Sequence, residues 1–171
     1  MARHARIGKA TIYSRFIGKR ELMHALMLRR IEARRAMLMA EGSALPLKEA
    51  FCMRATRILD MLHTPEQKLL ERLIDWFDQE SGAGKTGTRA TAYRGGINAI
   101  VEQLQAANDA GLATIVNLHQ AAQFWLEGLL GHARITESEG SAEPHQHESW
   151  ARQFTEFFFA GLTALQPPTE E

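Results

Sequence analysis

Apolar side chains recur every three or four residues along most of the chain, which is the period of a helix that buries one face. No stretch alternates apolar and polar residues as a half-buried strand does. The pattern therefore predicts an all-α fold, with helices at residues 9–16, 19–40, 47–63, 66–80, 89–110, 114–133 and 148–165. Gly42 and Pro46 interrupt it, so we expect a head at residues 1–42 and an antiparallel helical body at residues 46–166.

Glycine-rich and polar stretches mark the expected connections between these helices. Residues 81–88, SGAGKTGT, predict a flexible loop, and the polar residues 136–147 predict a second, mobile loop. Gly95 and Gly96 stand in the middle of an expected helix, where they allow a kink or the close approach of a neighbouring element.

The formal net charge of +0 conceals a strong asymmetry along the chain. Residues 1–35 carry ten Lys or Arg against two Glu, a net charge of +8, whereas residues 36–171 carry a net charge of −8. A basic head on an acidic body favours a head that meets a polyanion. The alternative reading of the charge alone is a solvated basic surface helix.

Cysteine usage and the first residues bear on the cell compartment. Cys52 is the only cysteine, which excludes an internal disulfide and an all-cysteine zinc site and fits a reducing compartment. No window holds the ~18 consecutive apolar residues of a spanning helix, and the basic first residues lack the apolar segment of a signal peptide. We expect a cytoplasmic protein without a membrane partner.

The densest pattern lies at residues 5–22, ARIGKATIYSRFIGKREL. Ile12 and Phe16 stand four residues apart and give residues 9–16 one apolar face. The remaining surface is basic and rich in hydroxyl groups, with Lys9, Thr11, Tyr13, Ser14 and Arg15. A short helix of this kind fits the major groove of DNA, where arginine, lysine and threonine reach base edges while tyrosine and lysine reach phosphates.

This stretch resembles the recognition-helix segment of the TetR family of transcriptional regulators. The residues that fit the family pattern are Ala5, Ile7, Lys9, Ala10, Thr11, Ile12, Tyr13, Phe16, Lys19, Glu21 and Leu22. Arg6 and Ile17 depart from it, because the family usually has a turn glycine and a proline there. The resemblance implies a helix-turn-helix head that contacts an operator in double-stranded DNA through Lys9, Ala10, Thr11, Tyr13, Ser14, Arg15 and Lys19.

The resemblance also implies a function for the body, which in this family binds an inducer. Aromatic and methionine side chains of the middle helices would then form a pocket for a small hydrophobic ligand. The candidate pocket residues are Phe51, Met53, Met61, Trp76, Tyr93, His119 and Trp125. Each of them taken alone is more often an ordinary core residue than a pocket residue.

The last two expected helices carry more large apolar side chains than one core can bury. Phe157, Phe158 and Phe159 are consecutive and so cover most of a helix circumference. The TetR resemblance implies a homodimer in which these two helices form a four-helix bundle with a second subunit. The expected interface residues are Leu126, Leu129, Leu130, Phe154, Phe157 and Phe158.

The resemblance thus implies a ligand-responsive transcriptional regulator, a repressor that a small hydrophobic molecule releases from its operator. The head is N-terminally incomplete relative to the family. In the family, one full helix and most of a second come before the recognition-helix stretch, whereas here only Met1 to His4 come before it. Two alternatives stay open. One is a ligand-binding, dimerising helical module that does not bind DNA in this truncated form, and the other is a natural start upstream of Met1.

No arrangement of residues points to an enzyme, a metal or a cofactor. Gly84-Lys85-Thr86 looks like the end of a phosphate-binding loop, but Gln79 stands where that motif has a glycine, and a helix precedes it instead of a strand. His145 and His147 have no third ligand nearby in the sequence. We therefore expect no catalytic residues.

Overall fold

The computed structural model describes residues 16–82, 87–140 and 144–164. Its elements are α2 (Lys19–Ala40), α3 (Leu47–Leu62), α4 (Pro65–Ser81), α5 (Thr88–Asp109), α6 (Leu118–Glu139) and α7 (Pro144–Ala164). No strand occurs in these ranges, so the all-α prediction is confirmed. Helices α2 to α5 begin and end within one residue of the expected ranges, and the expected helix at residues 9–16 lies outside the described residues.

The predicted loop at residues 136–147 is wrong, because α6 continues to Glu139 and α7 already begins at Pro144. Polar residues here stay helical because their side chains find partners on the helix or beside it. The Thr136 hydroxyl donates to the carbonyl of His132 at 3.0 Å, and Glu137 pairs with Lys68 of α4 at 3.0 Å. Gly140 then ends α6 in the left-handed region, with φ 65, which glycine adopts without strain.

Helix α6 also begins later than the expected residue 114. Asn117 caps it, and its side-chain oxygen accepts a hydrogen bond from the backbone N–H of Gln120 at 3.0 Å. The residues before it are held by Asn108, whose side chain bonds both the N–H and the carbonyl of Ile115 at 2.9 Å. These two asparagines fix the connection between α5 and α6.

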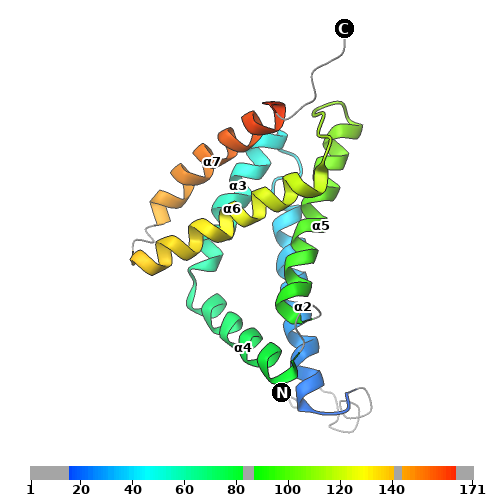
Figure 1. Cartoon of the computed structure of the whole chain (residues 1–171), viewed down its shortest axis with the longest axis vertical. Coiled ribbons are helices and arrows are strands. Elements are labelled where there is room, and N and C mark those ends of the chain that lie inside the picture. Colours follow the sequence, from blue (N-terminus) through cyan, green and yellow to red (C-terminus); the bar gives the residue numbers. More distant parts are fainter. Residues whose placement is uncertain (1–15, 83–86, 141–143, 165–171) are drawn as a thin grey trace.

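The main core lies where α3 meets α6 and α7, and α5 covers it on the side that faces α2 (Figure 1). Phe51 of α3 is its aromatic centre, 5.1 Å from the Trp125 ring in an edge-on arrangement and 5.3 Å from the Phe159 ring. The side chains of Leu59, Leu104 and Leu129 are fully buried around it. Burying each large apolar side chain contributes roughly 1.5–3 kcal/mol.

Helix α4 belongs to a second, smaller apolar cluster. Its residues Leu70, Ile74 and Phe77 pack on Met27 of α2, with Met23 and Ile31 of α2 at the edge. Because α4 packs on α2 here, it diverges from α6, as Figure 1 shows. The divergence leaves space between α4 and α6.

The Gly95-Gly96 pair permits the close approach of neighbours, as the sequence indicated. A Cβ on Gly96 would lie 3.2 Å from Leu126 Cδ2 of α6, and one on Gly95 would collide with the Arg35 guanidinium of α2. Helix α5 runs through both positions without a break, from Thr88 to Asp109. Across the described ranges, no helix has the length and apolarity needed to cross a membrane.

Candidate functional site

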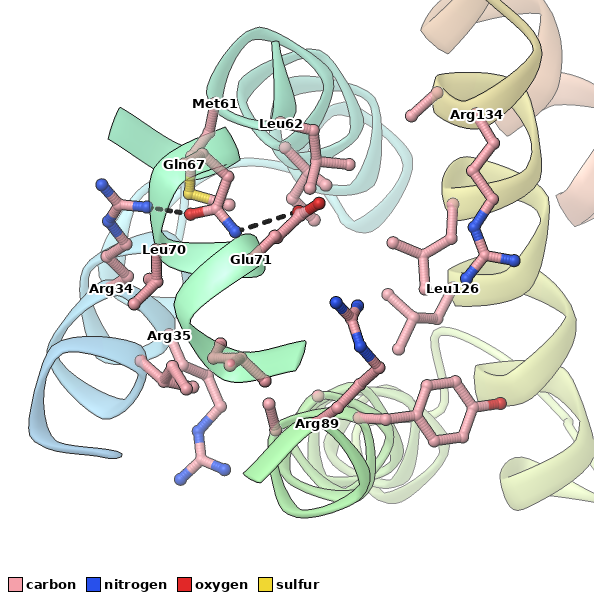
Figure 2. A pocket seen from close by; sticks show the side chains of 18 of the residues that line it. Arg34, Arg35, Met61, Leu62, Gln67, Leu70, Glu71, Arg89, Leu126 and Arg134 are labelled. Atoms are coloured by element: carbon pink, nitrogen blue, oxygen red, sulfur yellow. Dashed lines mark hydrogen bonds between the residues drawn. The ribbon is translucent and has the colours of Figure 1, made fainter. Parts of the chain in front are cut away.

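A cavity of about 1040 Å³ lies between α4 and α6, with α2, α3 and α5 forming the rest of its wall (Figure 2). Its deep surface is apolar and includes Leu38, Ile58, Ile74, Ile100, Trp125 and Leu130. A small-molecule pocket typically has a volume of about 300–1,000 Å³ and a mainly apolar lining with few polar groups. The cavity is thus large enough for an organic ligand.

The carboxylates around the cavity already have hydrogen-bond donors. Asp75 Oδ1 accepts hydrogen bonds from Nε of Arg89 at 3.0 Å and from Nη2 of the same side chain at 2.7 Å. Asp78 accepts the backbone N–H groups of Thr88 at 2.8 Å and Arg89 at 3.0 Å, and so holds the first turn of α5. Burial alone would raise the pKa of Asp78, but these two backbone bonds together hold it below its usual value.

Two carboxylates on the α6 side are engaged in the same way. The Tyr93 hydroxyl donates to Glu127 at 2.6 Å, which lowers the pKa of Glu127 and raises that of Tyr93. Lys68 pairs with Glu137 at 3.0 Å and lowers the pKa of that carboxyl by its hydrogen bond and its charge. Each of these four carboxylates therefore has a hydrogen-bond donor, and the lowered pKa values of Asp78, Glu127 and Glu137 favour their charged forms.

The arginines of the cavity differ from one another in their partners. Arg34 donates to the side-chain oxygen of Gln67, whose amide nitrogen in turn donates to Glu71 at 3.2 Å (Figure 2). Burial and the nearby Arg30 lower the pKa of Arg34. Arg134 of α6 makes no hydrogen bond or ion pair with any residue of the described ranges.

The structure brings three of the seven pocket candidates to this cavity. Met61, Tyr93 and Trp125 line it. The other residues lie outside the lining: Phe51 in the main core, Met53 against Gly42, Trp76 and His119 exposed on α4 and α6. Trp76 and His119 have side chains suited to a ligand pocket, but both are exposed on faces that do not line the cavity.

Sequence reasoning missed the polar members of the lining. Arg34, Gln67 and Arg134 stand among charged residues on helices, a pattern that usually indicates a solvated face. The sequence could have indicated them only through their positions on the helix faces that line the cavity. Which faces of α2, α4 and α6 line it, however, depends on the tertiary structure.

The predicted DNA contacts lie mostly outside the described residues. This applies to Lys9, Ala10, Thr11, Tyr13, Ser14 and Arg15. Lys19 is the first residue of α2 and is exposed. Gly84-Lys85-Thr86 and the side chain of His145 are likewise outside the description.

The six expected interface residues have four different environments. Leu129 and Phe158 are buried in the core, while Leu126 and Leu130 line the cavity. Phe154 stacks on Trp150 at 4.7 Å between ring centroids. Phe157 alone among the six is largely exposed, at 78 %, and Phe124 and Ile135 add exposed apolar area on α6.

A histidine cluster lies beside the cavity, between α3, α6 and α7. His147 is buried and its Nδ1 lies 2.9 Å from Asp60 Oδ1, so this nitrogen carries the proton that the carboxylate accepts. The ring stacks on His63 at 4.8 Å, and its Nε2 is buried without a partner among the described residues. No group of three or more His, Cys, Asp or Glu in the described ranges is arranged to hold a metal ion.

No protein-family model, curated protein or solved structure matches this chain. The resemblance to TetR regulators therefore rests on residues 5–22.

Proposed function

We propose that this protein is a TetR-like transcriptional regulator, acting as a repressor, in which a small molecule in the cavity controls DNA binding by the head. The observation that supports the proposal most is the position of α2. Its first residues follow the recognition-helix stretch directly, and its second half supplies Ile31, Arg34, Arg35, Leu38 and Met39 to the cavity wall. In this proposal, α2 would connect the DNA-binding stretch to the cavity.

The packing suggests how a ligand would move this helix. The first half of α2 packs on α4 through Met27, whereas its last turn is held by Arg54 of α3. A ligand that wedges α4 away from α6 would therefore carry the first half of α2 with it, while the last turn stays in place. A ligand changes DNA affinity only if it binds the two positions of α2 with different affinity.

The dimer belongs to the same proposal. Phe157 presents a large apolar side chain on the outer face of α7, which fits a surface that a second subunit covers. Two copies related by a two-fold axis would present two recognition helices to a palindromic operator.

Selection from random duplex DNA, followed by fluorescence anisotropy on the selected site, tests the proposal. We expect a two-fold symmetric site whose affinity falls with salt. Lys19→Ala should weaken binding to all sequences alike, whereas Arg15→Ala should relax the preference at one base position by about 1–3 kcal/mol. Selection that yields no enriched sequence at low salt would contradict the proposal.

The second candidate is a ligand-binding, dimerising module that does not bind DNA. The cavity and the exposed Phe157 favour it equally, since neither depends on residues 1–15. Ligand-induced stabilisation against heat, without any DNA affinity, would establish this alternative.

A further inference from the structure

Arg134 is the charged residue of the cavity lining that has no partner within the described ranges. Each of the other charged side chains there has a hydrogen-bonding or ionic partner: Arg35 pairs with Glu32 at 2.6 Å, Arg89 with Asp75, Glu137 with Lys68, and Arg34 and Glu71 share Gln67. Asp78 and Glu127 are held by the hydrogen bonds described above. Arg134 is therefore the charged side chain of this lining whose hydrogen-bond donors are left for a ligand.

The same face of α6 carries two leucines next to this charge. Leu126, Leu130 and Arg134 follow one another at intervals of four residues, and all three line the cavity. At a rise of 1.5 Å per residue, the backbone positions of Leu126 and Arg134 are about 12 Å apart along the helix. Figure 2 shows the Arg134 side chain on the cavity side of α6, reaching along the helix towards Leu126.

We infer that the cavity takes an elongated apolar monocarboxylate, with its hydrocarbon along Leu126 and Leu130 and its carboxylate on the Arg134 guanidinium. The planar guanidinium matches a carboxylate with two parallel N–H···O bonds. This inference deepens the proposed function and rests on the ligand-binding part of it alone.

The two other ligand classes fit the lining less well. A cation would find the carboxylates of the lining already engaged by Arg89, Lys68, Tyr93 and Gln67. An uncharged ligand of the same shape would cover Arg134 and remove water from it without providing an acceptor, which is unfavourable for a charge.

The test uses three probes with the same chain and different ends: decanoate, decanol and decylamine. Trp125 lines the cavity, so the double variant Trp76→Phe and Trp150→Phe, in which it is the remaining tryptophan, reports binding by fluorescence. We expect decanoate to bind about tenfold more tightly than decanol, as one charge-assisted contact implies. Arg134→Gln in that protein should remove this advantage and leave the affinity for decanol within about twofold.

The control variant is Arg29→Gln, an exposed arginine of α2 outside the lining. It should leave the affinities for all three probes unchanged, and thermal unfolding of each variant shows that the fold is intact. Equal affinity for decanoate and decanol, tighter binding of decylamine, or no binding of any probe would overturn the inference. So would Arg134→Gln lowering both affinities alike.

The two proposals fail separately. Affinity for the selected operator is measured without any ligand and does not involve Arg134. A protein that binds its operator but does not distinguish decanoate from decanol keeps the proposed function and loses this inference. A protein that binds decanoate through Arg134 but has no operator retains the inference and supports the second candidate function.

Discussion

Arg54 of α3 donates its Nε–H to the main-chain oxygen of Leu38, in the last turn of α2, over 3.1 Å. Its Nη2 reaches the oxygen of Met39 at 3.4 Å, and its Nη1 donates to the side chain of Gln103 in α5 at 2.8 Å. The side chain is 4 % exposed. One buried guanidinium thus satisfies carbonyls that the end of a helix leaves free, and it joins α2 to α3 and α5.

Replacing Arg54 should destabilise the protein strongly. Arg54→Met leaves two carbonyls at the end of α2 without their donor, and we expect the free energy of unfolding to fall by about 2–4 kcal/mol. Arg54→Lys should restore little of this stability, because a single ammonium nitrogen cannot replace the three guanidinium nitrogens that each donate a hydrogen bond here. Urea unfolding followed by circular dichroism measures both. Arg57→Gln, one turn further at an exposed position, should cost less than about 0.5 kcal/mol, and a cost equal to that of Arg54→Met would contradict the assignment.

Two glycines of α6 should respond in opposite directions to alanine. A Cβ on Gly128 would lie 2.6 Å from Cζ of Phe154, where α7 packs on α6, so Gly128→Ala should cost about 1–3 kcal/mol through overpacking. A Cβ on Gly131 meets nothing within 4 Å, so Gly131→Ala should stabilise the helix by up to about 1 kcal/mol. Thermal unfolding of the two variants measures both changes in stability. If both variants were more stable than the wild type, α7 would not pack on α6 at Gly128.

Stability should fall on acidification because of His132. Burial, together with His147 and His63 nearby, holds the pKa of His132 below its usual value. The folded protein therefore binds fewer protons than the unfolded chain below about pH 6.5, and stability present above that pH is lost as the pH falls through the lowered pKa. His132→Phe keeps an aromatic ring on Trp150, which His132 stacks on at 3.9 Å, and should make the loss between roughly pH 7 and 5 less steep. A slope identical to that of the wild type would exclude His132 as its cause.

Phe157→Glu should dissociate the proposed dimer without unfolding the subunit. The side chain is 78 % exposed, so the subunit loses little packing, while a charge at an apolar interface disfavours association. Light scattering at micromolar concentration should give the mass of two subunits for the wild type and of one for the variant. Leu69→Glu, at an exposed leucine of α4, serves as the control and should leave the mass unchanged. A wild-type protein with the mass of one subunit would refute the dimer itself.

The sequence by itself determined the fold class and the bounds of α2 to α5, because apolar periodicity and the breaks at Gly42, Pro46 and Pro65 act locally. It also pointed to Met61, Tyr93 and Trp125, which are large side chains on inward faces. It failed at residues 136–147, where a polar segment stays helical with the help of Lys68, a partner about 70 residues away in the chain.

The cavity itself was decided by the tertiary structure. Periodicity shows which residues of a helix share a face, but not which neighbour that face meets. The divergence of α4 from α6 follows from the packing of Leu70, Ile74 and Phe77 on α2. Because of that divergence, Arg134 lines a ligand-sized cavity, whereas Trp76 lies exposed outside it.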